Sequence, residues 1–210
     1  ETFHNFGLDF SDMNLYTINT KLKGIFNVNI EYNLYESYCE TWARIWNTIF
    51  YSYFTLSHVI NPDQSYFISE FYKNINIEAR HSLTQLLKIL QFHDLKYSII
   101  TKKNKENITI CNHLYSEQTS VFSYYIITGL LLNNYACFIN WCDINNDTTL
   151  LFKKTHENLD NYIDLIKKCN DNSHLIKTIN NIEKMILCNK TNMDESLRMT
   201  TLSMSKVFSN

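Results

Sequence analysis

The strongest hydrophobic pattern in the chain runs from Leu34 to about Ser57. Apolar side chains recur there at spacings of three and four, which is typical of a helix with a wide buried face. They are Tyr35, Tyr38, Cys39, Trp42, Ile45, Trp46, Ile49, Phe50, Tyr53 and Phe54. The run Asn61-Pro62-Asp63 ends this helix, because proline disfavours the helical conformation in the residue before it.

Helical spacing also recurs in most of the remaining chain. It predicts separate helices over 65–73 and 77–92, a largely apolar helix or broken pair over 115–141, and amphipathic helices over 147–168 and 173–188. The segment from Glu1 to Ile30 is expected to be irregular after its first residues, residues 96–112 show no clear pattern, and the tail from Asn189 is expected to be loose. The prediction is a mainly α protein with one helical domain over 1–190 and a polar tail over 191–210.

The composition favours the same mainly α fold class and argues against several classes of function. The 210 residues include only 3 Gly and 1 Pro, too few for a β-sandwich or a glycine-rich phosphate loop. The net charge is −2, and the longest basic cluster is Lys102-Lys103-Asn104-Lys105. No basic stripe is available for a run of phosphates, so nucleic acid is not an expected partner.

The cysteines and the longest apolar stretch bear on the compartment. The six cysteines contain no CxxC pair, which favours a reducing compartment such as the cytoplasm, including that of an infected cell, or a viral particle. Polar residues interrupt the apolar stretch from Val121 to Ile139, so no membrane span is expected, and no signal peptide is visible. Heavy use of Asn, Ile, Lys and Tyr is typical of AT-rich genomes, as in some protozoa and large DNA viruses.

Candidate chemistry begins at the first residue, in Glu1-Thr2-Phe3-His4-Asn5-Phe6-Gly7. This run resembles the HExxH helix of zinc peptidases, with the first histidine expected immediately before Glu1. The continuation Asn5-Phe6-Gly7 resembles the run after that motif in adamalysin-type peptidases, where the glycine ends the helix in a left-handed turn. The resemblance implies that His4 binds zinc and that Glu1 is the general base.

The third ligand separates two branches of this family. A metzincin would need a histidine where Phe10 stands, Asp9 is one position early, and no methionine lies between Met13 and Met185 for a Met-turn. A gluzincin takes a glutamate from a later helix, and Glu36 with Glu40 is similar to the ExxxE helix of anthrax lethal factor-like peptidases. On this resemblance Glu36 is the zinc ligand, and Glu40 is the acid one turn on that holds a ligand histidine.

The resemblance covers about the first 45 residues, comprising the active-site helix, a loop and the ligand helix. It implies a zinc-dependent metallopeptidase acting on a peptide or protein, in which zinc polarises a water and Glu1 takes its proton. This chain would then be the helical C-terminal lobe, with the sheet-containing N-terminal lobe outside it. Tyr124 is the chosen donor to the developing oxyanion, and Tyr32 and Tyr125 are alternatives.

A different class of function stays open. Without the first histidine, Glu1 and His4 fit an ordinary first helical turn, and Glu36 and Glu40 fit a solvated helix face. The chain would then be a non-catalytic interaction or structural module, or a pseudoenzyme, using exposed aromatics to bind a partner. Weaker site candidates are His156-Glu157 with Asp160, the separate histidines His81, His93 and His113, and Cys39 as a nucleophile.

Overall fold

A computed structural model describes residues 2–14, 16–56, 63–188 and 196–203 of the chain. These residues form helices and loops without a strand, so the expected mainly α class is confirmed. In chain order the elements are α1 (Thr2–Asn5), α2 (Tyr16–Ile25), α3 (Leu34–Thr55), α4 (Gln64–Phe92), α5 (Tyr97–Thr101), α6 (Lys105–Leu114), the π-helix η2 (Phe122–Ile127), α7 (Thr128–Leu132), α8 (Tyr135–Asn145), α9 (His156–Asn170) and α10 (Ser173–Cys188).

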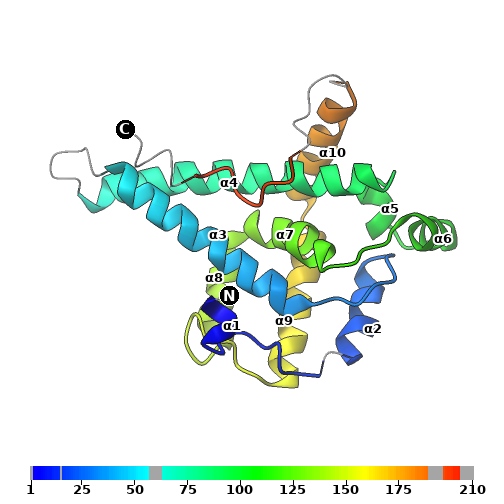
Figure 1. Ribbon diagram of the computed structural model, residues 1–210, viewed down its shortest axis with the longest axis horizontal. Helices are drawn as coiled ribbons and strands as arrows, with labels where there is room; N and C mark the ends of the chain where they lie inside the picture. The colour runs from blue at the N-terminus through cyan, green and yellow to red at the C-terminus, as the bar shows by residue number, and fades with distance from the viewer. Residues whose placement is uncertain (1, 15, 57–62, 189–195, 204–210) are drawn as a thin grey trace.

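The two longest helices, α3 and α4, organise the molecule. Their connected ends lie together at one side, and the helices diverge from there, with α7 between them (Figure 1). Both helices pack on η2 and α7, while α9 closes the core from the other side of α7. One hydrophobic cluster therefore runs from α2 to α10 and places the N-terminal half of α3 beside η2.

The helix α3 matches the sequence prediction closely, but α4 is a single helix where two were expected. No proline or glycine interrupts residues 73–77, so the helix has no local reason to stop. The polar Asn74 is buried at this point, and its side-chain amide donates to Ser52 Oγ on α3 at 3.0 Å. Because α3 satisfies this buried amide, the polar interruption in the apolar pattern does not break α4.

Asp63 begins the helix, its side chain accepting the Tyr66 amide at 3.0 Å; residues 57–62, including Pro62, lie outside the described residues.

The apolar stretch over 115–141 resolves as the broken pair. The π-helix η2 continues into α7, and α8 then turns away by 95°. Asn133 stabilises the break, since its amide donates to the carbonyls of Gly129 and Ala79 at 2.8 and 2.9 Å. Within the described residues no single helix is long and apolar enough to cross a bilayer; this bent pair reaches that length and composition only when both halves are counted.

Three other segments differ from the sequence expectations. Residues 16–25 form α2 instead of loop, because Ile18 and Leu22 are buried and α2 packs on α9. Residues 147–155 precede α9 as a loop, and Thr155 caps the helix by accepting the Asn158 amide. Residues 196–203, expected to be loose, lie along α4 (Figure 1).

Candidate functional site

The first helix lies across the N-terminal half of α3. The Phe3 ring stacks on Trp42 with centroids 6.4 Å apart and meets Tyr38 edge-on at 6.3 Å. Gly7 ends α1 with φ at +63°, a conformation that glycine adopts without steric cost, as the resemblance implied. This packing places His4 and the following loop against the face of α3 that carries Cys39.

His4 contacts the carboxylate of Asp9, a residue that the motif spacing excludes as a zinc ligand. Its Nδ1 lies 3.3 Å from Oδ2 of Asp9, while 63% of the His4 side chain is exposed. Asp9 is buried and also accepts hydrogen bonds from the Ser11 amide, the Ser11 hydroxyl and the Cys39 thiol. Burial opposes ionisation of Asp9, but these hydrogen bonds outweigh it and hold its pKa below 3.8.

The Asp9 carboxylate and the Ser11 hydroxyl both contact Nδ1 of His4, at 3.3 and 3.1 Å. An ionised carboxylate only accepts hydrogen bonds, so Nδ1 donates to Asp9, and in a neutral His4 the lone pair would be on Nε2. A histidine that binds a metal through one nitrogen almost always donates its other N–H to a carboxylate, a carbonyl or water. His4 therefore has the arrangement of a ligand histidine, with Asp9 as the acid that orients it.

Glu36 and Tyr124 come together from elements far apart in the sequence. Glu36 lies half-buried in the first turn of α3, and Tyr124 comes from the π-helix η2. Burial, together with the interaction with the Glu36 carboxylate, raises the pKa of Tyr124 well above 10.0. The phenol is therefore protonated at neutral pH. The irregular turn of η2 is typical of functional positions in helices.

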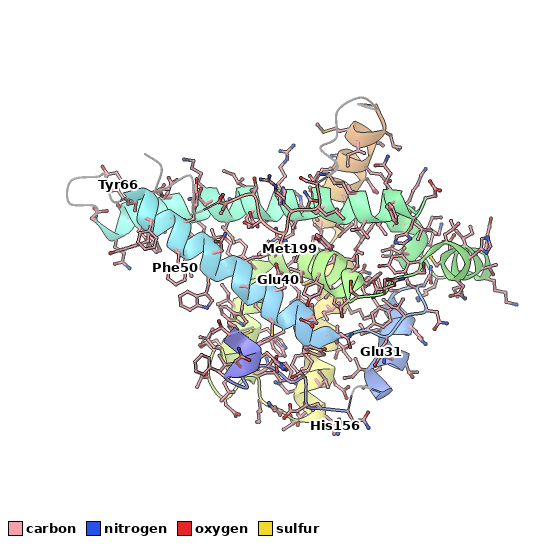
Figure 2. The ribbon with its side chains drawn as sticks, viewed as in Figure 1. Glu31, Glu40, Phe50, Tyr66, His156 and Met199 are labelled. Carbon is pink, nitrogen blue, oxygen red and sulfur yellow. The ribbon has the colours of Figure 1, made fainter. Side chains whose placement is uncertain are left out.

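Glu40 lies one turn after Glu36 on α3 (Figure 2). Burial raises the pKa of Glu40 to about 7, with Glu78 and Glu36 adding to the effect and Arg44 opposing it. At neutral pH this carboxyl is therefore divided between its two protonation states and can give or take a proton. Its expected contact with a ligand histidine stays a prediction, and for His4 that position is taken by Asp9.

A second polar group lies deeper on α3. Arg44 donates through Nε and Nη2 to Oε1 of Glu78 at 2.9 and 2.7 Å, and both side chains are buried. The remaining oxygen of Glu78 accepts the Thr201 amide at 3.1 Å. This ion pair is closed to solvent and is fully paired, which is typical of a structural role.

The described residues do not by themselves form a metal site. His4 and Glu36 are donors of the types that zinc prefers, but no three His, Cys, Asp or Glu side chains among the described residues form a group able to hold a metal ion. Glu1 lies outside the described residues. The fit is therefore partial: the orientation of His4 agrees with a ligand role, and the ligand set needs at least one further donor.

The weaker sequence candidates have other surroundings. Burial, with the adjacent Asp9, strongly raises the pKa of the Cys39 thiol, which donates a hydrogen bond instead of acting as a thiolate nucleophile. His81 and His93 each contact a backbone carbonyl, of Arg198 and Leu114 respectively. Tyr32 is fully buried and donates to the Val28 carbonyl, so it cannot reach a substrate.

Asp9 is the site residue that sequence reasoning missed. The motif spacing excluded it as a zinc ligand, and nothing in that spacing assigns it to His4. A signal was present in the local sequence, because Asp followed two residues later by Ser favours an Asx-type turn, and the Asp9 carboxylate accepts the Ser11 amide here. Comparison with known proteins adds no further assignment, since no protein-family model, curated protein or solved structure matches the chain.

Proposed function

We propose that the chain is the helical part of a zinc-dependent peptidase, with His4 and Glu36 as two zinc ligands and Glu1 as the general base. The single observation that carries the proposal is the contact between His4 Nδ1 and the buried Asp9 carboxylate, which leaves the Nε2 lone pair for a metal. The third protein ligand would come from the residue that precedes Glu1.

The arrangement of α3 and η2 supports the remaining roles. Zinc, when bound, would lower the pKa of a coordinated water so that it attacks a peptide carbonyl. Glu36 would face the metal, and Tyr124, whose pKa the Glu36 carboxylate helps to raise, would hold that carboxylate in place. Tyr124 would also be the donor nearest to a developing oxyanion, in keeping with its expected role. Glu40, with its pKa near 7, would exchange a proton close by.

The decisive experiment uses a chain extended upstream of Glu1, so that the residue before Glu1 is included. Zinc content by elemental analysis should be one per chain in the wild type and should be lost in His4→Ala and Glu36→Ala. The matched control is His113→Ala, which changes an exposed histidine on α6 and should retain zinc. A wild-type extended chain without zinc would end the proposal.

A second pair of variants separates catalysis from metal binding. Glu1→Gln should retain zinc but lose peptide hydrolysis on the order of 100-fold or more, because the general base is removed. Asp9→Asn should weaken zinc binding about 10- to 100-fold, because the acid that orients His4 is lost. Full turnover by Glu1→Gln on a peptide library would contradict the assigned mechanism.

A specific observation also favours the alternative of an interaction module. The joined ends of α3 and α4 carry exposed aromatics, with Phe50, Tyr53, Tyr66 and Tyr72 between 49% and 64% exposed. Side chains of this kind are enriched at protein interfaces. Tyr53→Ser with Tyr66→Ser should leave the thermal midpoint unchanged while removing binding to any partner of this surface. Partner binding that survives both changes would exclude this surface as the interface.

A further inference from the structure

The residues 196–203, here called the strap, contact side chains of α3, α4 and η2, and the surface that these side chains form is called the groove. They run along α4 in the opposite direction to the helix (Figure 1). The contacts extend from Lys88 to Glu78, about 15 Å of helix, which is a length that five residues of extended chain also cover. The strap is therefore held along its length and not at one point.

The hydrogen bonds that hold the strap go mainly to its backbone. The Ser196 carbonyl accepts from Lys88 at 3.1 Å, and the Leu197 carbonyl accepts from Tyr125 at 3.4 Å. The Arg198 carbonyl accepts from His81 at 3.0 Å, and the Leu202 carbonyl accepts from Asn47 at 3.1 Å. The Thr201 amide donates to Glu78 at 3.1 Å. Backbone contacts of this kind do not depend on sequence, and peptide-binding grooves use them for affinity while side-chain pockets supply specificity.

One side chain of the strap supplies that specificity. Leu202 is 6% exposed and lies outside the main hydrophobic cluster, whereas Leu197 is 48% exposed. Arg198 and Thr201 also face solvent. A leucine anchor whose neighbours are exposed or only half-buried is typical of a bound peptide, since a segment belonging to the core would bury more of its side chains.

The groove contains a buried acceptor directed at the strap. Glu78 is fully buried, its Oε1 is used by Arg44, and its Oε2 accepts only the Thr201 amide among the contacts of the described residues. A buried carboxylate oxygen without a partner is costly, so the groove requires a backbone N–H at this point. Any extended peptide can supply one.

We propose that the groove between α4, α3 and η2 is a binding site for extended peptides with a leucine-like anchor, and that the strap is its intramolecular occupant. A peptide from another molecule then binds by displacing the strap. The inference goes beyond the proposed hydrolysis, because peptide binding here needs neither zinc nor Glu1. The groove adjoins the candidate site, since Tyr125 follows Tyr124 on η2 and Glu40 lies near enough to Glu78 to feel its charge.

The test uses the full chain and a fluorescent synthetic peptide with the strap sequence, Ser-Leu-Arg-Met-Thr-Thr-Leu-Ser, in buffer with a chelator. In the wild type the strap competes at a millimolar effective concentration, so the peptide should bind weakly. Leu202→Ala removes the anchor of the strap and should tighten peptide binding at least about tenfold, as followed by fluorescence anisotropy. Leu197→Ala, the matched leucine control, should behave as the wild type does.

Two further measurements keep the result decisive. A peptide with alanine in place of the residue corresponding to Leu202 should lose the tight binding to Leu202→Ala. Thr201→Pro removes the N–H that Glu78 accepts and should open the groove in the same way without touching the anchor pocket. Equal peptide affinity in all four proteins would overturn the proposal. So would loss of folding in both Leu202→Ala and Thr201→Pro by near-ultraviolet circular dichroism, because the strap would then be an integral part of the fold.

Discussion

Two polar regions lie on the same helix, and they differ in how completely their charges are paired. Along α3, Arg44 meets Glu78 in a buried pair whose oxygens all have hydrogen-bond donors. One and two turns earlier on α3, Glu40 and Glu36 are only half-buried, and 63% of the His4 side chain on α1 is exposed. Complete pairing stabilises a charge where it is, whereas incomplete pairing at the surface leaves atoms available to a ligand. The comparison separates a structural ion pair from a candidate site.

The largest effect is expected at the ion pair. Glu78→Ala leaves the Arg44 guanidinium buried without a counter-charge and should reduce the free energy of unfolding by about 3–5 kcal/mol. Urea denaturation measures the change. The control is Asp160→Ala, which breaks the half-exposed pair with Lys21 and should cost less than about 1 kcal/mol. Similar losses in both variants would remove the distinction between buried and exposed pairs.

Asp9 should show the next largest effect, because it is the buried member of the candidate site. Asp9→Asn keeps the shape but removes acceptor capacity from Ser11, Cys39 and His4, and it should reduce the free energy of unfolding by about 1–3 kcal/mol. The pKa of Asp9 is lowered in the folded state, so its contribution is present above the unfolded value near 3.8 and is lost as the pH falls through the lower folded value. The free energy of unfolding from urea titrations should therefore differ less between pH 7 and pH 3 in the variant than in the wild type. An equal difference in both proteins would mean that another group causes the acid sensitivity.

Glu40 should give the opposite pH dependence. Its folded pKa of about 7 lies above the ordinary 4.5, so the protonated form is favoured by the fold. The stabilisation is complete below about pH 4.5 and is lost as the pH rises through 7. Glu40→Gln should remove this dependence, a change on the order of 1–3 kcal/mol between pH 4.5 and 8. The exposed Glu157→Gln should keep the wild-type profile, and a flat profile in the wild type itself would contradict the assignment.

The smallest effect is expected at Tyr124. Tyr124→Phe removes the phenol hydroxyl that interacts with Glu36 and should reduce the free energy of unfolding by about 1 kcal/mol, since the ring still packs. In the extended, zinc-loaded chain the same change should lower turnover about 100- to 1,000-fold if the phenol stabilises an oxyanion. The free energy of unfolding and the turnover of this variant should be compared. If Tyr124 had only a structural role, its substitution would reduce stability and activity together.

Sequence pattern alone predicted the elements whose signal is local. The helix from Leu34 and the helix over 173–188 follow from spacing, because a buried helix face repeats every three or four residues. The same spacing leaves residues 115–141 as either one helix or a broken pair, and the structure shows the broken pair. The resemblance at the N-terminus also selected His4 and Glu36, with Tyr124 as one of three tyrosine candidates for the oxyanion donor. Of these, Glu36 and Tyr124 interact in the structure, and the zinc scheme itself stays a proposal.

Contacts between distant segments decided the rest. The polar Asn74 interrupts the apolar pattern and predicts a helix end, but the Ser52 hydroxyl on α3 satisfies its amide, so α4 continues. Asp9 contacts His4 and Cys39 only when the loop after α1 folds back onto these two residues. The strap is a polar tail in the sequence, yet helix side chains satisfy its backbone and bury Leu202. Hydrophobic spacing records which face of a helix is buried, but the partner that satisfies a buried polar group lies elsewhere in the chain and is determined only by the tertiary structure.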